Sequence, residues 1–276
     1  MTAGQSSLPI GVFDSGVGGL TVLKELTYRL PNESFVYLGD TARVPYGNRS
    51  PETIVRYALE CAAFLAQQQI KLLVVACNTV SAFALPDLEE LLSIPVIGVI
   101  RPGAEKAALT SSSGNIAVAG TAATIGSGAY QRELLARLPA ATITAFACPL
   151  FVPLVEEHFL HHPATELIVA EYLKVLEGKS VDTLLLGCTH YPFLAPLIQK
   201  KLGNKVALID SASACAEKVA QLLEEKTLMN TFFPTSCLYY VSDDPAKFSK
   251  LAEQLFRVPI ATVHHPILNI QQQLAY

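Results

Sequence analysis

The chain has 276 residues, of which 51% are hydrophobic and 16% are charged. This balance is typical of a globular protein with a substantial core and excludes an intrinsically disordered chain. The formal net charge of −4 argues against nucleic-acid binding, which relies on a basic surface. No apolar run approaches the roughly 20 residues that a membrane helix needs, so we expect no membrane association.

The first half of the chain alternates short apolar runs with helical patterns. Strands are predicted at residues 10–14, 34–40, 71–77 and 95–100. Helices are predicted at residues 19–30, 51–69 and from the third strand to about residue 92, and Ser50 and Pro51 are typical of a helix start. Alternating strands and helices predict a parallel sheet with right-handed crossovers.

The second half repeats this plan. Strands are predicted at residues 115–120, 142–148, 183–188 and 205–210. Helices are predicted at residues 129–138, 165–177 and up to about residue 201, with the stretch VPLVEEHF in a loop. The tail adds a helix at 213–226, a strand at 237–242 and a helix at 245–256, and the remaining residues carry no clear pattern.

The two halves resemble each other in three places, which indicates an internal duplication. Three short motifs of the first half, at Ile10, Val44 and Cys77, recur in the second half. Their counterparts are at Ile116, Val152 and Cys188, at offsets of 106, 108 and 111 residues. The common order of the matches carries more weight than any single match. Chance similarity between two α/β halves is the alternative.

Polar side chains and thiols stand at the carboxyl ends of the predicted strands, where ligands of parallel sheets bind. These residues are Asp14, Asp40, Cys77, Cys148 and Cys188. If the halves face each other, Cys77 and Cys188 approach one ligand from opposite sides. This geometry suits racemisation, in which one group removes a proton from a stereocentre and the opposed group delivers one to the other face.

A helix is predicted directly after each of these two cysteines. The positive end of its dipole should favour the thiolate, which is the basic form of cysteine. The helix N–H groups, together with Asn78, Thr79 and Thr189, could hold a substrate carboxylate.

Each candidate residue also has a simpler interpretation. A lone cysteine at a strand end is more often packed than catalytic, and we interpret Cys61, Cys215 and Cys237 as structural and Cys148 as a neighbour of the site. His190 could cap a helix or relay a proton to Cys188. Asp14 could hydrogen-bond the backbone of its own turn. The following SGVGG is not a dinucleotide loop, because Thr21 occupies the last glycine position of that motif.

Five motifs in order give the chain a family resemblance: FDSGVGGLTVL, YLGDTARVPYG, ACNTVSA, CPLFVPLVEE and LLGCTHYPFL. Together they resemble the glutamate racemases of the aspartate/glutamate racemase superfamily over roughly residues 9–240. The resemblance implies a cytoplasmic enzyme that interconverts L- and D-glutamate, the latter for peptidoglycan, without PLP, metal or another cofactor. It also implies a homodimer.

The same resemblance implies roles for individual residues. Cys77 would act on D-glutamate and Cys188 on L-glutamate, with Asp14, His190 and Glu156 assisting. The implied substrate contacts are Asp14, Ser15, Tyr46, Gly47, Asn78, Thr79, Thr121, Thr124, Thr189 and His190.

The family fold implies two α/β lobes with the active site in the cleft between them. We expect the first lobe to comprise residues 1–98 plus 210–276, completed by the C-terminal segment, and the second to comprise residues 99–209. Two positions depart from the family pattern, since Val80 replaces an alanine and His158 a glycine. Both departures concern local packing. Only about nine residues precede the first strand, so we expect no activation by a cell-wall precursor.

Three other functions fit parts of the pattern. A racemase for aspartate would share the two-cysteine chemistry and differ in the size of its pocket. A metal protein could use Cys77, Cys188, His190 and Asp14, although the cysteines lack the close spacing of structural zinc sites. A solute-binding protein would be exported, and the N-terminal MTAGQSSLPIG has no secretory signal pattern. The six scattered cysteines, without a C-x-x-C pair, also favour a reducing compartment.

Overall fold

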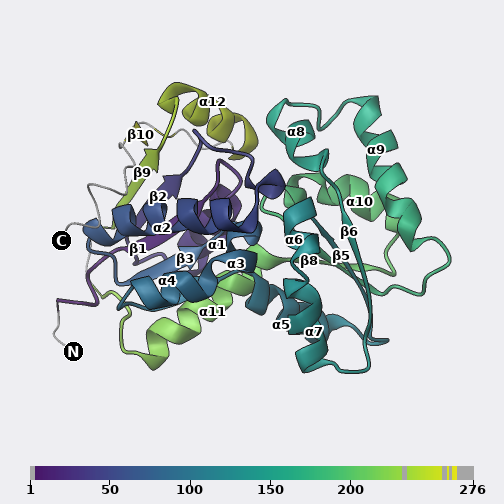
Figure 1. Ribbon diagram of the computed structural model, residues 1–276, viewed down its shortest axis with the longest axis horizontal. Helices are drawn as coiled ribbons and strands as arrows, with labels where there is room; N and C mark the ends of the chain where they lie inside the picture. The colour runs from purple at the N-terminus through teal and green to yellow at the C-terminus, as the bar shows by residue number, and fades with distance from the viewer. Residues whose placement is uncertain (1–3, 232–234, 257–259, 261–262, 266–276) are drawn as a thin grey trace.

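The computed structural model describes residues 4–231, 235–256, 260 and 263–265. These residues form two α/β lobes that lie side by side along the long axis of the molecule (Figure 1). Each lobe contains one parallel sheet with helices on both faces. The predicted α/β fold with two lobes is confirmed.

The sheet of the first lobe has the strand order β10-β9-β2-β1-β3-β4 among the described residues. Its strands are β1 (Ile10–Asp14), β2 (Phe35–Gly39), β3 (Leu72–Val75), β4 (Val96–Gly98), β9 (Cys237–Val241) and β10 (Val263–His264). Residue Asp14 is paired in register with Gly39 of β2, and Phe13 with Val75 of β3. The carboxyl ends of these neighbouring strands therefore lie together at one edge of the sheet.

The sheet of the second lobe has the order β6-β5-β7-β8. Its strands are β5 (Asn115–Gly120), β6 (Thr142–Ala147), β7 (Thr183–Gly187) and β8 (Ala207–Asp210). In both lobes the first strand along the chain lies between the second and the third, and the fourth follows the third. This shared order agrees with the internal duplication expected from the sequence.

Helices cover the sheets and connect their strands. In the first lobe they are α1 (Leu20–Arg29), α2 (Pro51–Gln67), α3 (Asn78–Phe83), α4 (Leu85–Leu91), α11 (Ser211–Glu225), α12 (Pro245–Phe256) and the 3₁₀ turn η1 (Tyr46–Asn48). In the second lobe they are α5 (Ile100–Thr110), α6 (Ala122–Gly126), α7 (Ala129–Arg137), α8 (Phe151–Glu156), α9 (Pro163–Leu173), α10 (Ala195–Leu202), η2 (Lys174–Leu176) and η3 (Tyr191–Leu194). None of the described helices is long and apolar enough to cross a membrane.

The central strands read as continuous apolar runs because both of their faces are covered. In β3, Leu72 and Val74 pack into one hydrophobic cluster, and Leu73 and Val75 pack into another on the opposite face. All four side chains are fully buried. Since burying one such side chain stabilises a fold by about 1.5–3 kcal/mol, the strands that carry the site are rigidly anchored.

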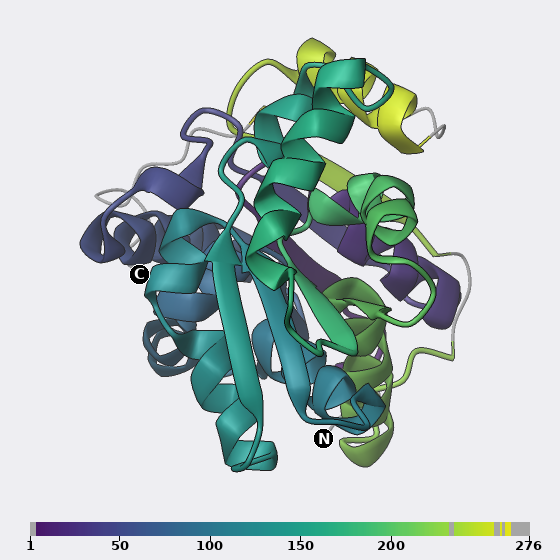
Figure 2. The same cartoon turned by 90° about the vertical axis from the view of Figure 1, so that its right-hand side faces the viewer.

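The C-terminal segment packs against the first lobe. Strand β9 pairs with β2, and the buried Lys71 donates to Glu33 at 2.5 Å and to the carbonyl of Leu228 at 2.8 Å. Helix α12 also lies beside the second lobe in both views (Figures 1 and 2), with the ring centroids of Phe256 and Phe193 5.2 Å apart. The tail therefore contacts both lobes.

Several elements of the structure differ from the prediction, among them the short helix α6 and the strand β10, for which no element was predicted. The stretch predicted as a loop, VPLVEEHF, begins within helix α8, because Pro153 occupies its first turn, where a backbone N–H has no intrahelical partner. Helix α5 was not predicted, because Ile100 continues the apolar run of β4. The helix expected up to residue 92 is divided into α3 and α4 at Ala84.

Candidate active site

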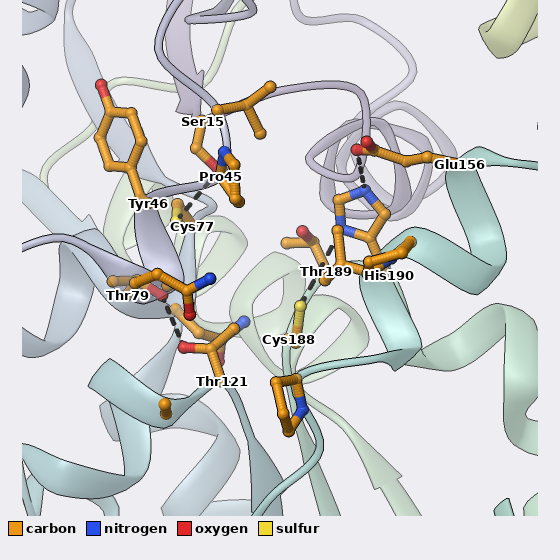
Figure 3. A pocket seen from close by; sticks show the side chains of 18 of the residues that line it. Ser15, Pro45, Tyr46, Cys77, Thr79, Thr121, Glu156, Cys188, Thr189 and His190 are labelled. Atoms are coloured by element: carbon orange, nitrogen blue, oxygen red, sulfur yellow. Dashed lines mark hydrogen bonds and ion pairs between the residues drawn. The ribbon is translucent and has the colours of Figure 1, made fainter. Parts of the chain in front are cut away.

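The carboxyl ends of the strands in the two lobes face a shared cavity of about 220 Å³ (Figure 3). Cys77 follows β3 in the first lobe, and Cys188 follows β7 in the second. Both side chains line the cavity although they are only 6% and 7% exposed. The other lining residues are Ser15, Val44, Pro45, Tyr46, Gly47, Asn48, Asn78, Thr79, Thr121, Ala122, Pro149, Val152, Pro153, Glu156, Glu157, Thr189 and His190.

Cys77 is the N-cap residue of α3, and its Sγ lies 3.6 Å from the hydroxyl of Ser15. Burial, and then the nearby carboxylate of Asp14, raise the pKa of the Cys77 thiol to about 12. The backbone N–H of Val80, in the first turn of α3, lowers this pKa as expected for a thiol at a helix N-terminus, but burial outweighs it. Helix α3 has only six residues, and its effect is smaller than the cost of burying a charge.

Cys188 is the first member of a chain of three side chains. Its Sγ lies 3.9 Å from Nδ1 of His190, and Nε2 of His190 lies 2.9 Å from the Glu156 carboxylate. Burial alone would lower the pKa of His190, but hydrogen bonds with Cys188 and Glu156 raise it to about 10. The protonated ring can donate toward the sulfur and the carboxylate at once. The helical turn after Cys188 begins only at Tyr191, so this cysteine does not directly precede a helix as predicted.

Asp14 is fully buried and does not line the cavity. Its Oδ2 accepts a 2.9 Å hydrogen bond from the N–H of Gly16. Asp14 therefore does hydrogen-bond the backbone of its own turn, as considered from the sequence. Its Oδ1 has no hydrogen-bond partner among the described residues. Burial is the main cause that raises the pKa of Asp14, and the charge of the adjacent His190 opposes this effect.

Three threonine hydroxyls connect the lobes beside the cavity. Oγ1 of Thr79 lies 3.0 Å from that of Thr121 and 3.1 Å from that of Thr124. Thr79 and Thr121 line the cavity, whereas Thr124 is fully buried behind them. Thr124 is therefore placed to support these two residues.

Tyr46 and Gly47 bring the loop after β2 to the second lobe. The hydroxyl of Tyr46 bonds to the buried carboxylate of Asp40, which also accepts from Arg43 and from Ser242. The phenol oxygen is consequently already engaged, and only the rest of Tyr46 faces the cavity (Figure 3). A Cβ at Gly47 would lie 2.7 Å from Cβ of Thr121, so the lobes can approach closely here because this residue has no side chain.

The walls of the cavity include residues that the sequence analysis did not propose as contacts. They are Val44, Pro45, Asn48, Ala122, Pro149, Val152, Pro153 and Glu157. Four of these residues could have been predicted from the duplication, because the matched Val-Pro pairs at 44–45 and 152–153 lie on the two sides of the cavity. None of the remaining cysteines lines the cavity, but Cys148 precedes the lining residue Pro149 and belongs to the same hydrophobic cluster as Cys188. All six cysteines are free thiols.

A metal site would need a cluster of suitable ligands. Within the described ranges, no group of three or more His, Cys, Asp or Glu side chains is arranged to hold a metal ion. This includes the set of Cys77, Cys188, His190 and Asp14 considered from the sequence.

Two thiols from opposite lobes, with a histidine and a carboxylate beside one of them, define the chemistry of a two-base racemase. The model of the Asp/Glu/Hydantoin racemase family matches residues 10–219, and the chain belongs to this family. It is therefore an isomerase.

The particular relatives are glutamate racemases. The chain is 48% identical to glutamate racemase of Geobacter metallireducens over 268 residues, 96% of this chain and 98% of the relative. Its fold is similar to the crystal structure of a glutamate racemase isoform from Bacillus anthracis, with a TM-score of 0.92, 39% identity and coverage of 94% and 97%. A glutamate racemase from Francisella tularensis, solved in complex with D-glutamate, has a TM-score of 0.90, 38% identity and coverage of 96% and 99%.

Proposed function

We propose that this chain is a glutamate racemase that interconverts L- and D-glutamate by a two-thiol mechanism and supplies D-glutamate for peptidoglycan. The observation that carries the mechanism is the placement of Cys77 and Cys188, from opposite lobes, on one cavity of about 220 Å³. The substrate assignment rests on relatives of 38–48% identity that are glutamate racemases.

In the proposed reaction, one sulfur acts as a thiolate and the other as a thiol. From L-glutamate, the Cys188 thiolate takes the α-proton, and the electron pair of the C–H bond remains on the substrate as a carbanion. The Cys77 thiol then donates its proton to the opposite face and gives D-glutamate. The reverse reaction exchanges the roles of the two sulfurs.

The neighbouring groups have distinct roles in this proposal. His190, held by Glu156, stabilises the negative charge of the Cys188 sulfur and returns protons to it. Asp14 lies outside the cavity, and its carboxylate acts electrostatically on the sulfur of Cys77. The space that would hold glutamate is lined by Ser15, Tyr46, Gly47, Asn78, Thr79, Thr121, Thr189 and His190. In this proposal Thr124 supports two of these residues, and Asp14 contacts the substrate once it is bound.

We propose that the reaction needs neither PLP nor a metal. No lysine, the residue to which PLP would be attached, is among the described residues that line the cavity. Activity that survives exhaustive chelation, with no PLP absorbance in the purified protein, would support this proposal. Loss of activity that added zinc or PLP restores would refute it.

The lobe boundaries and the assembly remain proposals as well. We place residues 1–98 plus 210–276 in the first lobe and residues 99–209 in the second, a division that follows the two sheets and the return of β9. We also propose a homodimer in the cytoplasm that binds no nucleic acid. Light scattering of the purified protein measures the mass that decides between a monomer and a dimer.

Isotope exchange tests the reaction itself. In D₂O, the product enantiomer should carry deuterium at Cα from the first turnovers, while the remaining substrate stays largely unlabelled. Mass spectrometry after chiral separation measures both pools. D-aspartate, tested in parallel, should be converted far more slowly. Faster conversion of aspartate would reject glutamate as the substrate, and a product without deuterium would reject proton exchange with the thiols.

A further inference from the structure

Tyr130 connects the two lobes directly behind the cavity. It lies in α7 of the second lobe and is fully buried. Its hydroxyl donates a 2.6 Å hydrogen bond to Oδ1 of Asn78, the first residue of α3 in the first lobe. Its ring packs against Gly187, where a Cβ would approach the ring to 2.9 Å. Tyr130 does not line the cavity, whereas Asn78 does.

This contact fixes which way the Asn78 amide faces. Burial raises the pKa of Tyr130 far above its usual value, so the phenol stays protonated and acts as a donor. The buried side chain of Ser211, at the start of α11, opposes this effect, as a hydroxyl directed at the phenol oxygen does. The hydrogen bond with Asn78 uses the single phenol proton. Only the amide oxygen of Asn78 can accept it.

The other end of the same amide is unpaired. Nδ2 of Asn78 is buried and has no hydrogen-bond acceptor among the described residues. A buried donor without a partner is unfavourable, unless a ligand supplies the acceptor. Because Asn78 lines the cavity, a carboxylate oxygen of a bound amino acid is an acceptor of suitable chemistry.

We propose that Tyr130 is a positioning residue, which holds the Asn78 amide with its N–H₂ group presented to a carboxylate of the substrate. The inference rests on the proposed function, since it names the group that orients one substrate contact. The hydrogen bond between Tyr130 and Asn78 links α7 of the second lobe to the wall of the cavity in the first lobe. Substrate binding thus depends on a hydroxyl that never touches the substrate.

Replacing Tyr130 by phenylalanine removes the hydroxyl and keeps the ring against Gly187. In Tyr130→Phe the Asn78 amide can turn, so we expect the KM for D-glutamate to rise about tenfold while kcat changes less than about threefold. A contact made equally in the bound substrate and in the transition state affects KM in this way. Tyr172→Phe is the matched control, because that hydroxyl lies outside the cavity and accepts a hydrogen bond from the N–H of Leu150, and its kinetic constants should not change.

A double-mutant cycle separates positioning from general loosening of the fold. Asn78→Ala should raise KM by itself, and adding Tyr130→Phe should then raise it no further. An unchanged KM in Tyr130→Phe, or an equal rise in the Asn78→Ala background, would overturn the inference while leaving the proposed function intact. If the unmodified protein fails to racemise glutamate, both proposals fall together.

Discussion

At the scale of single residues, the two thiols have unlike surroundings. The Cys77 sulfur lies 3.6 Å from the neutral hydroxyl of Ser15, whereas the Cys188 sulfur lies 3.9 Å from a histidine whose pKa is raised to about 10. A symmetric pair of bases therefore works in an asymmetric environment. The duplicated motifs share the two cysteines but not the residues that contact their sulfur atoms.

Serine substitutions test the two thiols one at a time. A serine hydroxyl is too weak an acid to form the required base at neutral pH, so Cys77→Ser and Cys188→Ser should each lower kcat by about 10³-fold or more. Circular dichroism follows the loss of optical activity of D-glutamate. Cys237→Ser, at a thiol outside the cavity, should keep full activity. Racemisation at the control rate by either cavity variant would contradict the mechanism.

The same single variants should retain half of the chemistry. With a glutamate analogue that carries a leaving group on the β-carbon, removal of the α-proton alone leads to elimination and needs no second thiol. Cys188→Ser should therefore still act on the D-analogue and Cys77→Ser on the L-analogue. Product formation from both enantiomers by one variant would show that the thiols are not divided between the two faces.

The raised pKa of His190 predicts a loss of stability in alkali. The folded protein binds this proton more tightly than the unfolded chain, whose histidine has a pKa of about 6.5. The contribution is complete below pH 6.5 and is lost as the pH rises toward about 10. Between pH 7 and 9 we expect the free energy of unfolding to fall by about 1–3 kcal/mol more than in His190→Asn, as measured by urea denaturation. Cys77 and the other buried thiols also lower the stability as the pH rises, but they do so in both proteins. An equal pH dependence of the free energy of unfolding in the two proteins would therefore contradict the raised pKa of His190.

At the scale of elements, the end of helix α8 shows what one family departure does. The N–H of Phe159 donates to the carbonyl of Leu154, and that of His158 to Val155, which are the two bonds of a Schellman motif. His158 occupies its left-handed position with φ 60°, where glycine is preferred. This helix carries Glu156, so the strained residue lies two positions from the side chain that holds His190.

Restoring the family glycine should stabilise the protein. The left-handed conformation costs a residue with a side chain about 1–2 kcal/mol, and the extra freedom of glycine in the unfolded chain offsets up to about 1 kcal/mol. We expect His158→Gly to raise the free energy of unfolding by about 0.5–1 kcal/mol in urea denaturation. His161→Gly, at a nearby exposed histidine without a positive φ, should lower it. A less stable His158→Gly protein would show that the imidazole makes a compensating contact.

Apart from β10, the strands could be predicted to within two or three residues because their sequences are apolar, as in Leu72–Val75, which is buried on both faces. Helices α5 and α8 could not, because each begins inside an apolar run and has a proline in its first turn. The opposed cysteines followed from the repeated motifs. The hydrogen bond between Tyr130 and Asn78 joins residues 52 positions apart, so no local pattern indicates it. The hydrogen bond between Tyr46 and Asp40 joins residues six positions apart and depends on how the loop after β2 folds.

At the scale of the whole molecule, the cavity exists because the lobes meet through small residues. A side chain at Gly18 would lie 2.5 Å from the His190 ring, and one at Gly103 would lie 3.1 Å from Ser211. Across the same boundary, the hydroxyl of Thr21 donates to the carbonyl of Thr189 at 3.2 Å. The spacing of the two sulfur atoms is therefore set by contacts on several sides of the cavity.

Gly47→Ala should change that spacing with a single methyl group. The new Cβ would press on Thr121 from a rigid turn, so the lobes must separate or the turn must shift. Because a displacement of about 1 Å at reacting groups can cost about 10²-fold, we expect kcat/KM to fall by a factor of that order. Gly126→Ala, where nothing lies within 4 Å of the added methyl, should retain activity. Equal activity of both variants would show that the lobes adjust freely.

The pairing of β9 with β2 has a consequence for how the protein is made. Every strand of the second sheet leaves the ribosome before Cys237–Val241 does, although β2 was synthesised long before. The nascent chain thus carries an open sheet edge at Phe35–Gly39 until its last elements emerge, and such edges invite mispairing and aggregation. A premature stop between β8 and β9 releases a complete second sheet attached to an unfinished first one.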